Sequence, residues 1–280
     1  MPAPIATMVK QLVRLKFTSF GIKVPLNWQH PTGEALKAWN TAFKDSDKTV
    51  PPGMPPLFLP ATMNKVHVDT QKMHIDKIGK FMDDMTDSIC AAWSKWQSLA
   101  SLAGVLVNGP TASMGMIAAP PIDMLILAEM MPKATTPMLM KYTKAIATVI
   151  GRGWMAWQSS FKIPGLPMFP LFAMMTSPVA PPTASIPFPL LAMTQVSTTL
   201  SAQVLKGMMV AELGDVMAPF HDKLFEAFAD GFEKTFIQWQ ATTQVMKVMG
   251  TGPVPTFAPP YVPGGPVVGG TGFAAPGFLV

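Results

Sequence analysis

A motif of tryptophan, glutamine and proline recurs in the sequence and limits the folds that this chain can adopt. Its first copy begins at Trp93-Ser-Lys-Trp96-Gln97 and ends at Ala119-Pro120-Pro121. Its second copy begins at Trp154-Met-Ala-Trp157-Gln158 and ends at Ala180-Pro181-Pro182, and the two copies keep one constant spacing. Between the two ends, Gly104 and Gly165 fall at equivalent positions. A repeat of this kind predicts a structural unit that is used more than once.

A third, shortened copy keeps Trp239-Gln240 and Ala258-Pro259-Pro260. We interpret each unit as an amphipathic helix with tryptophan near its C-terminal end, followed by an extended arm. Two consecutive prolines remove two backbone donors and fix two φ angles, so the arm is expected to resist both a helix and a central strand. Such a segment favours a polyproline rod.

Periodicity and capping residues predict the helices. The clearest helix is expected over about 70–99, where apolar residues follow helical spacing up to Trp93 and Trp96. The next begins with Thr136 as N-cap and Pro137 at the first helical position, and extends to about Ser160. Gly151 and Gly153 within it are expected to allow close packing. A third helical region, 195–248, is expected to break at Gly214 and Pro219.

The N-terminal region carries weaker signals. Residues 2–18 are predicted to form a short helix. Thr32 is an N-cap candidate for a helix that carries Trp39 and precedes the proline-rich stretch 50–60, which makes it a degenerate fourth copy of the unit.

These patterns predict a mainly α fold with extended proline-rich arms, built from three internal repeats, or four with the degenerate copy, in a pseudo-three-fold arrangement. The expected domains are 1–64 (N-terminal region), 65–135 (repeat 1), 136–193 (repeat 2) and 194–280 (repeat 3 with a Gly/Pro-rich arm). Arms that cross a bundle within the chain and arms that dock on neighbouring subunits both remain open. A duplicated helical hairpin whose function lies elsewhere is a third alternative.

Composition favours an assembly. The 280 residues include 30 prolines and 24 methionines, but only 13% are charged. Average usage would give about 14 prolines. Apolar, proline-rich segments without charge need a cover, which a soluble monomer supplies with difficulty. The basic residues Lys10, Arg14, Lys16 and Lys23 are expected to form a solvated face rather than a nucleic-acid site. The single cysteine, Cys90, excludes an internal disulfide and is expected to be buried.

Two further patterns bear on location. Residues 163–205 contain no charged side chain, but repeated prolines exclude a continuous membrane-spanning helix there. The beginning of the sequence, Met1-Pro-Ala-Pro-Ile, lacks the features of a signal peptide, so synthesis in the cytoplasm is expected.

The sequence contains no recognisable catalytic motif. Phosphate-binding loops, nucleophile elbows and dinucleotide fingerprints are missing. His67 and His74 do not follow a zinc-site spacing. We therefore expect no enzyme, cofactor or metal. The residues predicted to matter are structural anchors (Trp93, Trp96, Gln97, Trp154, Trp157, Gln158, Trp239 and Gln240) and the Ala-Pro-Pro motifs of the arms (Ala119, Pro120, Pro121, Ala180, Pro181, Pro182, Ala258, Pro259 and Pro260).

The Ala-Pro-Pro motifs and Gly250-Thr-Gly-Pro253 with the Gly/Pro tail resemble structural accessory proteins of phage virions and contractile injection machines. That resemblance implies a non-enzymatic component of a virion or similar particle, such as a phage-tail or baseplate and spike assembly, in which arms clip subunits together. The expected partners are other structural subunits. The main alternative is a membrane-associated or membrane-active protein whose Met/Phe/Pro-rich arms insert into lipid. An enzyme without a recognisable motif is a third hypothesis.

Overall fold

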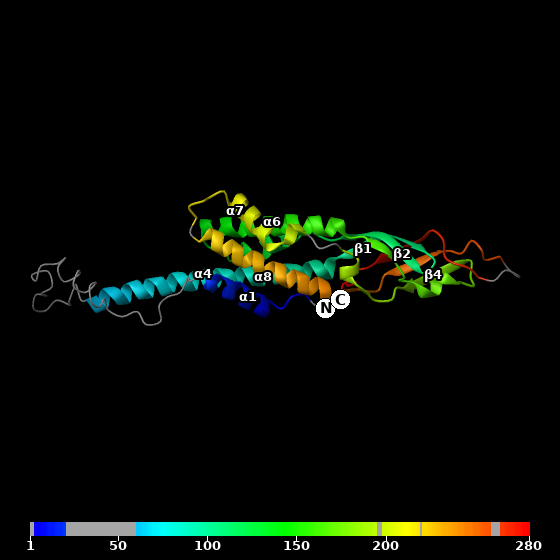
Figure 1. The fold of residues 1–280 in the computed structure, drawn as a ribbon, viewed down its shortest axis with the longest axis horizontal. Helices are drawn as coiled ribbons and strands as arrows, with labels where there is room; N and C mark the ends of the chain where they lie inside the picture. The colour runs from blue at the N-terminus through cyan, green and yellow to red at the C-terminus, as the bar shows by residue number, and fades with distance from the viewer. Residues whose placement is uncertain (1–2, 21–59, 195–197, 219, 259–263) are drawn as a thin grey trace, which may run out of the picture. The chain divides into compact units, whose positions relative to one another are not determined.

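The computed structural model describes residues 3–20, 60–194, 198–218, 220–258 and 264–280 (Figure 1). The chain divides into two compact units, one made of Met1–Phe17 and Met82–Val280, the other of Thr18–Phe81. The helix predicted after Thr32 lies outside the described residues.

Six α-helices are described. They are α1 (Ala6–Ser19), α4 (Pro60–Leu99), α5 (Ile122–Met130), α6 (Pro137–Ser160), α7 (Ala202–Leu213) and α8 (His221–Thr242). Three short 3-10 helices lie in the segment between α6 and α7: η1 (Pro170–Ala173), η2 (Leu190–Ala192) and η3 (Thr198–Leu200). No described helix combines the length and the hydropathy needed to cross a bilayer.

Capping residues determine where the helices begin and end. The Thr136 side chain accepts a hydrogen bond from the Leu139 amide, and Pro137 is the first helical residue of α6. Gly214 ends α7 in the left-handed conformation, with φ +62°. These boundaries confirm the predicted helix over 137–160 and the predicted break after 213.

Glycines let the helices approach one another closely. A Cβ at Gly151 would lie 2.5 Å from Cβ of Asp123 on α5, and one at Gly153 would lie 2.6 Å from Cδ2 of Leu200 in η3. The predicted role of both residues in close packing is confirmed. On α8, a Cβ at Gly231 would lie 2.5 Å from Cγ2 of Val13, so α1 also rests directly on a helix backbone.

The segments between the helices form β-strands. They are β1 (Ser101–Asn108), β2 (Thr111–Ala118), β3 (Ile163–Leu166), β4 (Val179–Ala184), β5 (Phe188–Pro189), β6 (Gln244–Val245), β7 (Met249–Pro253) and β8 (Gly270–Ala274). Six of them make an antiparallel sheet in the order β3-β2-β1-β8-β7-β4. The sheet continues from the C-terminal ends of the long helices (Figure 1).

The remaining strands hold the end of the chain. β5 pairs with β6, and Leu279 forms a bridge to Val245 on β6. The Gln244 amide donates to the Val280 carbonyl at 2.7 Å, and the Val280 amide donates back at 2.9 Å. Phe278 and Leu279 are buried, so the end of the Gly/Pro-rich tail is part of the core.

One face of the six-stranded sheet is buried under the segment that follows β3. Phe169 and Phe172 stack in parallel with their ring centroids 5.1 Å apart. A Cβ at Gly250 on β7 would lie 2.7 Å from the Phe169 ring, so the glycine is what allows the ring to lie on the strand. Val105 and Leu102 of β1 complete this buried face.

The predicted fold class is wrong. The protein is mixed α/β with a six-stranded antiparallel sheet, and it is not a mainly α chain of helix-plus-arm repeats. The arms pair with one another as strands, although they contain prolines. Pro164 lies in β3 and Pro181 and Pro182 lie in β4, which are the two edge strands, whereas the inner strand β7 has a proline, Pro253, only as its last residue. The register shifts at the Pro181–Pro182 pair, as in a β-bulge.

Candidate functional site

The tryptophans of the repeated motif meet in one buried cluster. Trp93 and Trp96 come from α4, Trp154 and Trp157 from α6, and Trp239 from α8. The ring centroids of Trp93 and Trp154 are 4.8 Å apart and those of Trp96 and Trp154 are 4.9 Å apart. All five side chains are at most 3% exposed. The cluster therefore joins the C-terminal ends of three helices.

The glutamines of the motif tie these helix ends to distant backbone. Gln97 accepts a hydrogen bond from Nε1 of Trp239 at 3.1 Å and donates one to the Leu279 carbonyl at 3.0 Å. Gln158 donates to the Ile117 carbonyl on β2 at 2.9 Å. Gln240 donates to Oγ1 of Thr194. Each glutamine thus connects its helix to a segment far away in the sequence.

The other indole N–H groups have no conventional partner. Nε1 of Trp93, Trp96, Trp154 and Trp157 is buried and meets no hydrogen-bond acceptor among the described residues. Several of these rings meet edge to face, for example Trp96 and Trp154 at an interplanar angle of 84°. In that geometry the electropositive edge of one ring faces the π-electrons of another. The arrangement is that of a packed core rather than of a ligand site.

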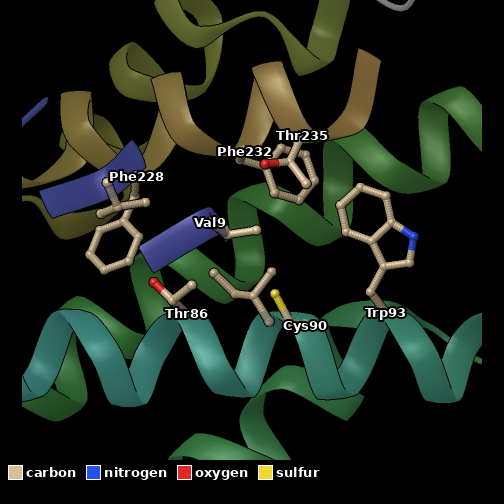
Figure 2. A pocket seen from close by; sticks show the side chains of 9 residues that line it. Val9, Thr86, Cys90, Trp93, Phe228, Phe232 and Thr235 are labelled. Carbon is tan, nitrogen blue, oxygen red and sulfur yellow. The ribbon is translucent and has the colours of Figure 1, made fainter. Parts of the chain in front are cut away.

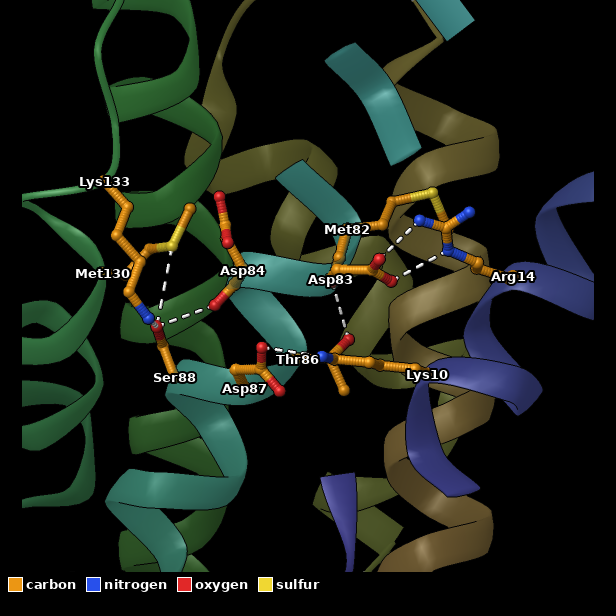
Figure 3. Close-up of polar contacts among 10 residues, drawn as sticks. All are labelled: Lys10, Arg14, Met82, Asp83, Asp84, Thr86, Asp87, Ser88, Met130 and Lys133. Atoms are coloured by element: carbon orange, nitrogen blue, oxygen red, sulfur yellow. Dashed lines mark hydrogen bonds and ion pairs between the residues drawn. The ribbon is translucent and has the colours of Figure 1, made fainter. Parts of the chain in front are cut away.

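Ion pairs fasten α1 to its neighbours (Figure 3). Nζ of Lys10 lies 2.7 Å from Oδ2 of Asp87, and Nε of Arg14 donates to Oδ1 of Asp83 at 2.8 Å. The hydrogen bond to Asp87 raises the pKa of Lys10. Lys16 pairs with Glu226 on α8 at 3.1 Å. These three basic residues, which were predicted to lie on a solvated face, have side chains that are 29%, 50% and 32% exposed and that also make ion pairs within the chain. Lys23 lies outside the described residues.

A small cavity lies where α1, α4 and α8 meet (Figure 2). Its volume is about 10 Å³, and its lining includes Val9, Cys90, Trp93 and Phe232. Burial raises the pKa of the Cys90 thiol to about 12. The predicted burial of Cys90 is confirmed.

The second face of the six-stranded sheet is exposed. Directly opposite residues share a face, and one row of such pairs joins Ser113, Leu106, Thr271 and Thr251 across four strands. A neighbouring row joins Phe273, Met249 and Ala184. Met116 on β2 lies opposite Ala103 on β1, near the end of the β1–β2 pair that adjoins the helices. We call these residues, with the strands that carry them, the open face.

The open face is uncharged, and its largest exposed side chains are apolar, although hydroxyl side chains share it. Met116 is 65% exposed, Phe273 57% and Leu106 39%. None of the described strands contains Asp, Glu, Lys or Arg, and the segments 96–122, 163–205 and 248–280, which hold every strand except β6, carry no charged residue at all. The charged side chains of the residues that the structure describes are therefore concentrated on the helices and the turns beside them. Large exposed apolar patches of this kind are typical of interaction surfaces.

The Ala-Pro-Pro motifs lie in different settings. Ala119 and Pro120 join β2 to α5, and Pro121 is the N-cap of α5. Ala180 lies buried in β4, where its carbonyl accepts a hydrogen bond from Oγ1 of Thr251 at 2.6 Å. Ala258 is exposed, and Pro259 and Pro260 lie outside the described residues. The structure does not bring these motifs together into one site.

The open face was not found from the sequence. A signal for it was available in Gly109-Pro110, since a glycine at the first of two loop residues between apolar runs is typical of a β-hairpin. The structure shows a two-residue turn there, with Asn108 opposite Thr111 and Gly109 at φ +57°.

No group of three or more His, Cys, Asp or Glu side chains is placed to hold a metal within the part of the chain that the structure describes. The side chains of His67 and His74 lie outside the described residues. The chain matches no family model, no curated protein and no solved structure with which it was compared.

Proposed function

We propose that the protein is a non-enzymatic structural component of a multisubunit particle, and that the open face is buried against other subunits there. The observation that carries this proposal is the segregation of charge. The helices carry the ion pairs and the charged surface, whereas the sheet exposes Met116, Phe273 and Leu106 without a single charge in its strands. A partner that covers these side chains would gain about 25 cal/mol for each Å² of apolar surface removed from water.

The kind of particle follows from the resemblance described above. We propose a virion or contractile-injection particle, at a phage-tail, baseplate or spike position, with other structural subunits as partners. The sheet, rather than a set of proline-rich arms, would supply the contact.

A membrane surface is the second candidate, because the same uncharged region also exposes Leu171 and Met174 beyond the sheet. Bilayer insertion is less favourable for this architecture. β3 and β4 each pair with a single neighbour in the described sheet, and unpaired edge groups are costly in hydrocarbon.

Co-sedimentation with particles purified from the source cells tests the proposal. The variant Phe273→Glu places a charge on the open face, and Met155→Glu places one at a residue of α6 that is similarly exposed, at 61%. The wild type and Met155→Glu should appear in particles at equal stoichiometry, and Phe273→Glu should be depleted. Normal incorporation of Phe273→Glu, or a wild type found only as free protein, would contradict the proposal. Flotation of the wild type with anionic vesicles, lost in Phe273→Glu, would favour the membrane candidate.

A further inference from the structure

We infer that the partner on the open face is a second copy of this chain, and that the two sheets pack face to face around a two-fold axis. This inference rests on the proposed function, since it names the first contact that an assembly would make. It depends on the area of the face, its lack of charge and the chemistry of the sheet edges.

The area of the face is sufficient for a dimer. Six strands about 4.8 Å apart give a width of about 29 Å, and strands of four to eight residues are about 13–27 Å long. Each copy would therefore contribute roughly 400–750 Å². The total for two copies is close to or above the ~1,000 Å² expected of a specific interface.

The charge distribution favours a contact between identical faces. The chain has a net charge of +5, so most contacts between two copies would bring like charges together. The strands carry none of this charge. The face is also suited to pair with itself, because bulky Met116 and Phe273 share it with small residues such as Ala103, Thr251 and Thr271.

The edges of the sheet direct association toward the face. Exposed edge strands usually invite another strand. Here β3 contains Pro164, and β4 contains Pro181 and Pro182, which cannot donate to an added strand. Side-by-side extension of the sheet is thereby disfavoured, and face-to-face packing remains.

Sedimentation equilibrium of the purified full chain tests the inference. The wild type and Met155→Glu should form dimers, and Phe273→Glu and Met116→Glu should each raise the dimer dissociation constant at least about tenfold. Circular dichroism melts recorded below the dimer dissociation constant should be alike for all four proteins, since every substituted side chain is exposed and no dimer adds stability at that concentration. A wild type that stays monomeric, or sheet variants that dimerise as well as the wild type, would overturn the inference.

A crosslinking experiment locates the axis. Leu106 and Thr271 are Cα partners on the two central strands, so they lie near any two-fold axis that passes through the middle of the face. Facing sheets are about 10 Å apart, which a short bis-maleimide can span. Thr271→Cys should give a covalent dimer and Met155→Cys should not; equal yields from both variants would overturn the face-to-face arrangement.

The particle experiment separates this inference from the proposed function. If the free chain is a monomer but Phe273→Glu is still depleted from particles, a different subunit covers the face, and only the inference fails. If Phe273→Glu also enters particles normally, the proposed function fails as well.

Discussion

Replacement of Gln97 by leucine should destabilise the protein more than any other single change among the motif glutamines. The side chain is buried, accepts from Nε1 of Trp239 and donates to the Leu279 carbonyl. In Gln97→Leu the Trp239 indole N–H and the Leu279 carbonyl lose their hydrogen-bond partner while they remain out of water. A buried polar group left without its hydrogen bond costs about 1–3 kcal/mol. Two such groups, less the gain from an apolar side chain, give a net loss of about 2–4 kcal/mol.

Urea unfolding followed by tryptophan fluorescence measures this loss, and a fall in Tm of roughly 5–12 °C should accompany it. Gln158→Leu is the matched control. Gln158 is only partly buried and makes one bond, to the Ile117 carbonyl, so water can replace it and the cost should stay near 1 kcal/mol. Equal losses in the two variants, or a loss below about 0.5 kcal/mol in Gln97→Leu, would refute the reasoning.

A double-mutant cycle isolates the hydrogen bond itself. Trp239→Phe removes the donor that Gln97 accepts from. Once Gln97→Leu has removed the acceptor, the loss of that donor should cost at least about 1 kcal/mol less than it does in the wild type. Strictly additive effects would show that the two side chains are not coupled.

The contacts of Gly231, Glu226 and Cys90 can each be tested in solution. Gly231→Ala should destabilise by about 1–2 kcal/mol, because its Cβ would meet Val13, whereas the same change made in a Val13→Ala background should cost little; thermal melts of the four proteins measure both effects. Hydrogen bonds from Lys206 and Lys16 lower the pKa of Glu226 below 4.5. The ionised side chain therefore stabilises the fold above that pH, and this stabilisation is lost as the pH falls through the lowered pKa. The Tm difference between wild type and Glu226→Gln should vanish in acid. Burial and a pKa of about 12 should keep Cys90 unreactive to iodoacetamide at about pH 8 until urea unfolds the chain, and rapid labelling of the native protein would contradict its placement.

The helices could be predicted because their signals are local. Thr136 and Pro137 specify the start of α6, and Gly214 specifies the end of α7, through contacts within one turn. The constant spacing of Gly104 and Gly165 also has a structural counterpart, since both adopt a positive φ in the first strand after a long helix. Each of these features is determined by a few residues that are neighbours in the sequence.

The sheet could not be predicted in the same way, because its strands pair over long distances in the sequence. β1 pairs with β8, and β4 pairs with β7. The prolines seemed to exclude strands, but whether a proline is tolerated depends on its place in the finished sheet, which no local pattern reveals. The acceptor for the Trp239 indole could not be predicted either, since Gln97 lies on a different helix.

The tryptophan cluster and the open face belong to one construction. α4 ends at Leu99 and β1 begins at Ser101, α6 is followed by β3, and α8 is followed by β6 and β7. Each strand-bearing segment therefore leaves a helix whose end is fixed in the cluster by a tryptophan and a glutamine. Because the strands carry no charge and few polar side chains, their own side chains make few specific contacts that would orient the strands relative to the helices. The tryptophan cluster fixes the helix ends and thereby positions the strands that follow them. This explains why the repeated motif consists of buried side chains. The surface that we propose for assembly lies in the segments that follow the motif.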